Sequence, residues 1–337
     1  MILRKKITLD EAKKRINDSY EVENNVINAV PNPLVSVYIS TYQHVNFIQT
    51  AIESILMQET TFPFEIIFGE DFNTDGTREI AFEYAEKYPD LIRLITADYN
   101  VQQQANHMRC LSACRGKYVA ICDGDDYWTD PKKLQIQADF MEANPDYSMC
   151  CHPYQIKKNG IVSDKLLPVS PKDYSGDELI ATPHGMHHSS KLVINIFQEI
   201  DIKTLFHFHN DYPINALLGT YGKCKFLKDI KPSVYLHHTD GAWSSMDSKS
   251  KKHNYLNLKM RLYRNFLVMD DERSAMIALD SLRKTLENQR YSEGAPKTLE
   301  VTYTYLIFFF RGIRIEFHYH PIARFFKRII NRFTRKG

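Results

Sequence analysis

The stretch that decides the fold is Lys-Tyr-Val-Ala-Ile-Cys-Asp-Gly-Asp-Asp-Tyr-Trp-Thr-Asp-Pro, residues 117–131. Its first part, Tyr118 to Cys122, is short, mostly apolar and rich in strand formers, which is typical of an inner strand of a covered parallel sheet. Three carboxylates follow within four residues: Asp123, Asp125 and Asp126. Because open α/β sheets place their ligands at the carboxyl ends of strands, the cluster predicts a ligand site there.

This acidic cluster also suggests a cation. Unpaired carboxylates so close together repel one another and raise each other's pKa, and a bound cation would neutralise them. Hard oxygen ligands favour Mg²⁺ or Mn²⁺. Alternation along an extended chain puts Asp123 and Asp125 on one side, and Gly124 lets a ligand approach the backbone. The alternative is a solvated acidic turn that caps the helix beginning near Pro131.

Strands and helices alternate around this stretch. The predicted strands are Leu34 to Ser40, Phe64 to Gly69, Leu91 to Thr96 and Tyr118 to Cys122. The predicted helices are Phe47 to Met57, Thr77 to Tyr88, Asn106 to Cys114, Lys132 to Ala143 and Ile214 to Tyr221. This rhythm predicts an α/β fold with a mostly parallel sheet flanked by helices. From Cys150 to Ser190, many Pro, Gly, His and Ser residues predict loops that build a substrate pocket.

The whole chain has 337 residues and a formal net charge of +2, which fits a globular protein with a large core. Its six cysteines lack the paired spacing of a zinc site and no signal peptide opens the chain, so we expect free thiols in a reducing cytosol. The longest apolar run, Tyr305 to Phe310, is too short to span a bilayer. The chain has no Gly-rich phosphate loop, which argues against dinucleotide oxidoreductases and P-loop enzymes.

Polar residues follow the other predicted strands. Glu70 and Asp71 end the second strand, where an acceptor could meet a ribose hydroxyl or a base N–H. In the same turn Thr74 or Asp75 could cap the next helix. Three further residues could reach a bound diphosphate: Asn100, Asn106 and Arg109. Arg109 could equally pair with a surface carboxylate.

Further candidates lie downstream. Asp211 opens a predicted helical stretch, where the helix dipole favours a carboxylate. His238 follows a predicted strand and is either a structural histidine or a third metal contact. The segment from Thr182 to Ser190 contains His187 and His188, which are candidates for contact with an acceptor.

Taken together, these motifs resemble family 2 glycosyltransferases with the GT-A fold. The resemblance covers roughly residues 33–244 and rests on five ordered segments: residues 33–42, 65–77, 123–128, 210–213 and 234–244. It implies an inverting enzyme that moves a sugar from a nucleotide-diphosphate donor, a UDP-sugar, to a hydroxyl of a glycan or lipid-linked acceptor in cell-surface polysaccharide biosynthesis. It also implies an Asp-x-Asp metal motif.

The resemblance assigns roles to individual residues. Asp211 would be the catalytic base, and Mg²⁺ or Mn²⁺ would be held by Asp125, Asp123 and His238. The donor site would be formed by Ser40, Tyr42, Glu70, Asp71, Asn100, Asn106, Arg109, Asp123 and Gly124. The acceptor region would include His187, His188 and Trp243. The chain departs from the family pattern at Glu70, which replaces Asp, at Phe72 and Gln102, which replace Gly, and at Asn210, which replaces an acidic residue.

Four regions are expected: a helical lead-in (1–32), a GT-A domain (33–245), a helical extension (246–300) and a basic amphipathic tail (301–337). Within the domain, residues 33–130 would bind the nucleotide and residues 131–245 the acceptor. The tail has eight Lys or Arg against the single Glu316, with apolar residues on one helical face. It predicts peripheral attachment to anionic lipid on the cytoplasmic face of the membrane, or else a helix packed on the domain.

Two rival functions use the same residues. A nucleotidyl or phosphoryl transferase could employ the acidic metal site, and a non-catalytic protein of this fold could bind glycans. We expect no nucleic-acid partner.

Overall fold

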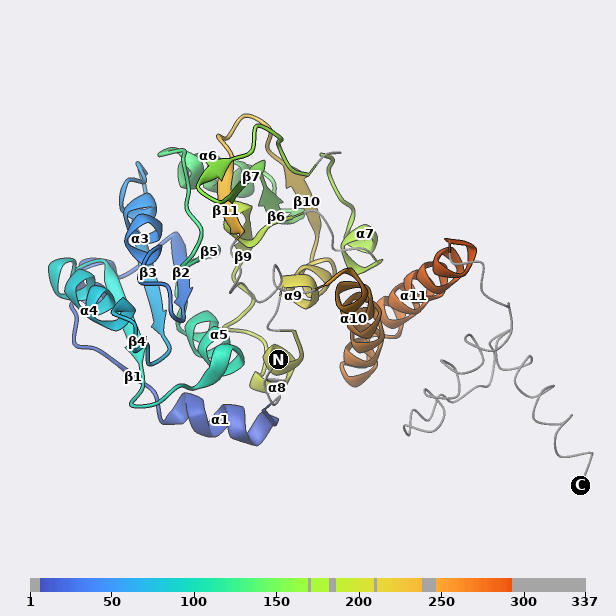
Figure 1. Ribbon diagram of the computed structural model, residues 1–337, viewed down its shortest axis with the longest axis horizontal. Coiled ribbons are helices and arrows are strands. Elements are labelled where there is room, and N and C mark those ends of the chain that lie inside the picture. Colours follow the sequence, from blue (N-terminus) through green and yellow to red (C-terminus); the bar gives the residue numbers. More distant parts are fainter. Residues whose placement is uncertain (1–6, 169–170, 182–185, 209–210, 238–246, 293–337) are drawn as a thin grey trace, which may run out of the picture. The chain divides into compact units, whose positions relative to one another are not determined.

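The computed structural model describes residues 7–168, 171–181, 186–208, 211–237 and 247–292 (Figure 1). By its internal contacts the chain divides into two units, residues 1–282 and 283–337. The predicted tail, 301–337, lies outside the described residues, as do His238 and Trp243. No helix in the described part is both long enough and apolar enough to cross a membrane.

Among the described residues, eight strands form one sheet in the order β1-β4-β3-β2-β5-β9-β6-β10. Its strands are β1 (Tyr20–Glu21), β2 (Val35–Thr41), β3 (Phe64–Glu70), β4 (Ile92–Thr96), β5 (Tyr118–Asp123), β6 (Tyr147–Cys151), β9 (Leu192–Ile194) and β10 (Lys223–Phe226). Neighbours from β4 to β5 are parallel, β10 is parallel to β6, and β1 and β9 are antiparallel to their neighbours. The predicted α/β class with a mostly parallel sheet is confirmed.

Helices cover both faces of the sheet because side chains alternate along each strand. One face carries Val35, Val37 and Ile39 under three helices: α3 (Ile48–Leu56), α4 (Thr77–Lys87) and α6 (Lys133–Ala143). The other face carries Tyr38 and Ile121. Its helices are α1 (Leu9–Asn17), α5 (Gln102–Ala113), α7 (Gly176–Ala181), α8 (Ile202–Phe208), α9 (Asp211–Leu218), α10 (Ser248–Val268) and α11 (Glu272–Ser292).

The segment predicted as loops contains regular structure instead. Among the described residues, a three-stranded sheet has the order β11-β7-β8, formed by β11 (Ser233–His237), β7 (Tyr154–Lys158) and β8 (Ile161–Val162). The 3₁₀ helix η1 (His188–Ser190) precedes β9. The loop prediction is therefore wrong for β7, β8 and α7, because tertiary pairing outweighs local composition.

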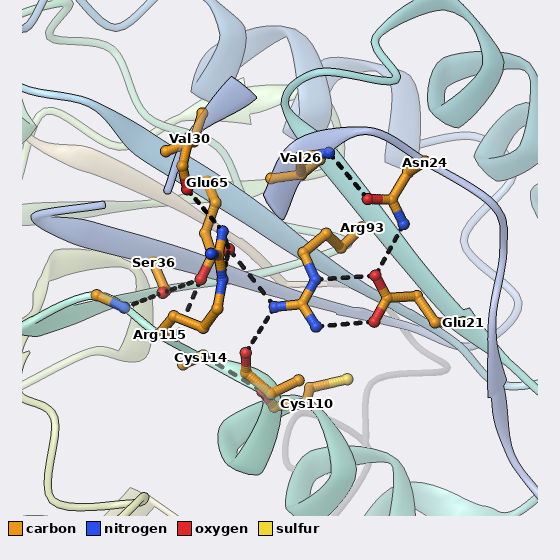
Figure 2. Close-up of polar contacts among 12 residues, drawn as sticks. Glu21, Asn24, Val26, Val30, Ser36, Glu65, Arg93, Cys110, Cys114 and Arg115 are labelled. Atoms are coloured by element: carbon orange, nitrogen blue, oxygen red, sulfur yellow. Dashed lines mark hydrogen bonds and ion pairs between the residues drawn. The ribbon is translucent and has the colours of Figure 1, made fainter. Parts of the chain in front are cut away.

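The N-terminal segment, in which no strand was predicted, is tied to the sheet. It contains a short helix, α2 (Val26–Ala29), and the strand β1, which pairs with β4. Arg93 of β4 donates to both Glu21 oxygens at 2.9 and 2.8 Å, and it lies 3.5 Å from Glu65. Figure 2 shows that Glu65 also accepts hydrogen bonds from Ser36 Oγ at 2.7 Å and from Arg115. A fully buried carboxylate is thus satisfied by two guanidinium groups and a hydroxyl.

The predicted free thiols are confirmed as unbridged, since all six cysteines are buried and free.

Candidate functional site

Three parallel strands end at one edge of the sheet and bring candidate residues together. Ser40 pairs in register with both Gly69 of β3 and Asp123 of β5, and Thr41 pairs with Glu70. Ser40 Oγ donates to Asp123 Oδ1 at 3.4 Å and lies 3.5 Å from His107 Nε2 of α5. The strand ends therefore place Ser40 beside Asp123, as expected for a ligand site at this edge.

The acidic loop after β5 holds three carboxylates in different environments. Burial, and next the Asp125 carboxylate, raise the pKa of Asp123 to about 7. Burial and the other two carboxylates also raise the pKa of Asp126. Asp126 accepts from the Leu236 N–H at 3.1 Å and lies 3.5 Å from His187 Nδ1. Asp126 thus anchors the loop to β11, while Asp123 contacts Ser40 and Asp125 lies near His44.

Residue 124 must be glycine because neighbouring atoms leave no space for a side chain. Its N–H donates to the Ser40 carbonyl at 2.8 Å. A Cβ at this position would lie 2.9 Å from His44 Nδ1 and 2.9 Å from the same carbonyl oxygen, too close for any side chain. The close packing brings His44 to the loop, where its Nε2 lies 3.8 Å from Asp125 Oδ2.

The carboxylate pair fits a divalent cation in its chemistry. Two carboxylates separated by one residue, one with a raised pKa, form a site that a cation would stabilise. Within the described ranges, no three His, Cys, Asp or Glu side chains form a metal cluster. Since Mg²⁺ is commonly held by one or two carboxylates together with water and substrate phosphates, the pair is sufficient on the protein's side.

Glu70 is placed as an internal anchor of the turn after β3. It is fully buried, its Oε1 accepts from the Asn73 N–H at 2.6 Å and from the Asn73 amide at 2.8 Å, and its Oε2 accepts from Arg78 and Thr96. Asp71 is also buried and accepts from the Val101 N–H at 2.6 Å. Burial raises the pKa of Asp71 to about 6.

A backbone feature explains two departures from the family pattern. Phe72 and Gln102, which stand where glycine is frequent, have φ of 54° and 72°. The left-handed conformation costs a residue other than glycine roughly 1–2 kcal/mol. The backbone path of the turn is therefore the one glycine adopts, although the side chains differ.

Asn106 and Arg109 lie beneath the strand end. Both are buried in α5. The Asn106 amide donates to the Gly69 carbonyl at 3.1 Å, and Arg109 donates to the Glu70 carbonyl at 2.7 Å and to Ser19 Oγ at 2.8 Å. These contacts do not include the alternative considered for Arg109, a pairing with a surface carboxylate, and its role at the donor site stays a prediction. Asn100 is closer to the turn surface and donates to the Asp71 carbonyl at 3.1 Å.

The predicted acceptor region is aromatic. The His187 ring lies between Tyr154 and Tyr235, with ring centroids 5.0 and 4.6 Å away. Burial lowers the pKa of His187 to about 3, so the ring is neutral. His188 is buried, and the Tyr42 side chain beyond β2 is exposed. Asp211 is the first residue of α9. This position is compatible both with a carboxylate favoured by the helix dipole and with the catalytic base that the resemblance implies.

Four residues near the site were not predicted from the sequence: His44, His107, Lys191 and Asn215. His44 closely follows the strand that supplies Ser40, so its position was a usable signal. Lys191 is a charged residue at the start of the apolar run Leu192 to Ile194, which is a second usable signal. His107 and Asn215 lie within helices and carry no sequence signal.

Comparison with known proteins gives consistent matches. Residues 36–191 match the model of Glycosyl transferase family 2. Over 220 residues the chain is 32% identical to an uncharacterized protein of Mycobacterium tuberculosis, covering 65% of this chain and 63% of that protein. It is 26% identical to the hyaluronan synthase of Pasteurella multocida over 297 residues, covering 85% of this chain and 29% of the synthase. The chain thus spans less than two thirds of these relatives.

Among solved structures, the fold is similar to that of S. aureus TarS 1–349 in complex with UDP-GlcNAc. The TM-score is 0.52 with 17% sequence identity, and the match covers 77% of this chain and 73% of that chain. At this identity the likeness concerns the fold alone.

Proposed function

Because this chain belongs to glycosyl transferase family 2 and has the GT-A fold, we propose that it is an inverting, metal-dependent glycosyltransferase. It moves a sugar from a nucleoside-diphosphate donor to a hydroxyl of a glycan or lipid-linked acceptor in polysaccharide biosynthesis. The observation that carries the proposal is the carboxylate pair at the end of β5, where Ser40 lies 3.4 Å from Asp123. The similarity to a hyaluronan synthase supports a glycan acceptor.

The proposed donor site uses the edge formed by β2, β3 and β5. Asp125 and Asp123 would hold Mg²⁺ or Mn²⁺, with His238 as a further contact. The cation would neutralise charge on the diphosphate leaving group. Ser40 and Tyr42 would line the nucleoside site, while Glu70 and Asp71 hold the turn beside it. TarS was solved with UDP-GlcNAc, which places UDP-sugars first among donors to test.

The acceptor hydroxyl would lose its proton to Asp211 as its oxygen attacks the anomeric carbon. His187, His188 and Trp243 belong to the proposed acceptor side. The bond formed joins the acceptor oxygen to the sugar, and the bond broken releases the nucleoside diphosphate.

The test is a panel of nucleotide sugars with Mn²⁺ or Mg²⁺, read by release of nucleoside diphosphate and by NMR of the product. We expect nucleoside diphosphate, inverted anomeric configuration and a loss of rate on chelation. Asp211→Asn should retain donor binding and lose about 10² to 10⁴ in rate, the usual contribution of general-base catalysis. Release of pyrophosphate or nucleoside monophosphate would instead identify a nucleotidyl or phosphoryl transferase.

The tail, residues 301–337, is proposed to hold the enzyme on anionic lipid at the cytoplasmic face of the membrane. Each basic residue near such a surface adds about 1 kcal/mol. We expect the full chain to sediment with anionic vesicles at low salt. A full-length variant with Arg324, Lys327, Arg328 and Arg332 changed to Gln should not, while keeping donor hydrolysis. Equal sedimentation of the two proteins would contradict this attachment.

A further inference from the structure

Lys191 is a fully buried lysine close to the proposed donor site. It immediately precedes β9, whose Leu192 and Val193 pair antiparallel with Ala120 and Val119 of β5. In this register each step back along β9 is a step forward along β5, so Lys191 lies beside Ile121. Cross-strand partners share a face, and residues two apart in a strand share it too. Lys191 therefore lies on the same face of the sheet as Asp123, one diagonal position away.

The ammonium group of Lys191 is hydrogen-bonded to a neighbouring helix. Its Nζ donates to Asn215 Oδ1 at 3.1 Å. Burial lowers the pKa of Lys191 to about 8, and the Asp123 carboxylate is among the groups that favour its charged form. In turn, Lys191 counteracts the rise in the pKa of Asp123. A buried ammonium is costly unless it is paired, so Lys191 and Asp123 stabilise each other's charge.

The hydrogen bond to Asn215 reaches a second functional element. Asn215 is a buried residue of α9, the helix that begins at Asp211. Residues four apart in a helix lie one above the other on the same face. The Lys191–Asn215 bond therefore holds the position and rotation of this helix one turn after residue 211.

We propose that Lys191 is a positioning residue for glycosyl transfer, a buried cation that joins the Asp123 end of β5 to helix α9. It sets the spacing between the proposed donor diphosphate site and the proposed base Asp211, and this inference rests on the proposed function. A displacement of about 1 Å between reacting groups can cost about 10²-fold in rate.

A second buried lysine offers a matched control. Lys133 of α6 is also buried, donates to Gln137 Oε1 at 2.7 Å and lies 4.0 Å from the Trp128 ring centroid. Its helix covers the opposite face of the sheet. Changing Lys133 to Met removes a buried ammonium of the same kind and leaves both partners of the Lys191–Asn215 hydrogen bond in place.

The experiment compares Lys191→Met, Asn215→Leu, their double variant and Lys133→Met in the full chain. Calorimetric titration with UDP or GDP and MnCl₂ counts the competent sites, and kcat and the donor KM are then measured per site. We expect Lys191→Met to lower kcat about 10- to 100-fold with a nearly unchanged donor KM. Asn215→Leu should lower kcat similarly, and the double variant should lose little more. Lys133→Met should keep kcat per site.

Normal kcat per site in Lys191→Met would overturn the positioning role while leaving the proposed function intact. If Lys191→Met does not fold, Asn215→Leu becomes the test of the Lys191–Asn215 link. Normal kcat per site in Asn215→Leu would then overturn the positioning role of Lys191. Equal losses of kcat per site in Lys133→Met and Lys191→Met would also overturn it. A wild-type chain that binds neither nucleotide and transfers no sugar refutes the proposed function itself, before any variant is compared.

Discussion

Asp125→Ala is expected to abolish glycosyl transfer while leaving the protein folded. The change leaves Asp123 as the one carboxylate of the proposed metal pair. A single carboxylate would hold Mg²⁺ or Mn²⁺ poorly. The loss of a metal worth several kcal/mol corresponds to about 10³-fold or more in rate. Nucleoside diphosphate release and calorimetric Mn²⁺ binding in the presence of UDP measure the two effects.

The control for this variant is Asp139→Ala. Asp139 is exposed on α6, where it accepts from Gln135 at 2.8 Å. It lies in the same segment of sequence but outside the acidic loop, so its removal should leave rate and metal binding unchanged. Full turnover by Asp125→Ala, or by the wild type in excess chelator, would exclude the metal-dependent mechanism.

Glu65→Ala is expected to lower the free energy of unfolding by about 3–5 kcal/mol, the usual cost of removing one partner from a buried ion pair. Glu65 accepts from the Arg115 N–H and Nε, both at 2.9 Å, and the change leaves the Arg115 and Arg93 guanidinium groups facing an empty buried position. Urea denaturation, followed by circular dichroism, measures the loss.

The matched control is an ion pair at the surface. Asp146 and Lys223 lie 2.7 Å apart with both side chains more than half exposed. Exposed pairs contribute little because water screens them and their long side chains lose entropy on pairing. Asp146→Ala should therefore leave the denaturation midpoint unchanged. A similarly small effect of Glu65→Ala would mean that the buried network does not stabilise the fold.

Much of the main sheet could be predicted from the sequence. The strands from β2 to β5 begin and end within one residue of their predicted bounds, because short apolar runs between turns are strong local signals. Helix α5 begins at Gln102, four residues before its predicted start, since the left-handed Gln102 lets the chain turn earlier. The antiparallel β9, which lies between β5 and β6, depends on long-range pairing that local patterns do not encode.

For the site, the sequence predicted that Ser40, Asp123 and Gly124 lie close together, but not which way the neighbouring side chains point. Ser40, Asp123 and Gly124 meet at one edge because strand ends are fixed by sheet topology. The direction of Glu70, Asn106 and Arg109 could not be predicted, since it depends on buried partners such as Arg78 and Ser19. A polar residue near a strand end can face a ligand or support the backbone, and only tertiary contacts separate these roles.

The N-terminal attachment bears on how this enzyme can be divided for experiments. Ser19 contacts Arg109, and Arg109 in turn holds the Glu70 carbonyl at the proposed donor turn. Glu21 forms an ion pair with the Arg93 guanidinium of β4. An expression fragment trimmed to the family match, residues 36–191, would therefore lose supports of the donor turn and of β4. In a chimera that joins the nucleotide-binding half of this chain to a relative's acceptor half, the piece from this chain should begin at Thr8, where the capping box of α1 begins.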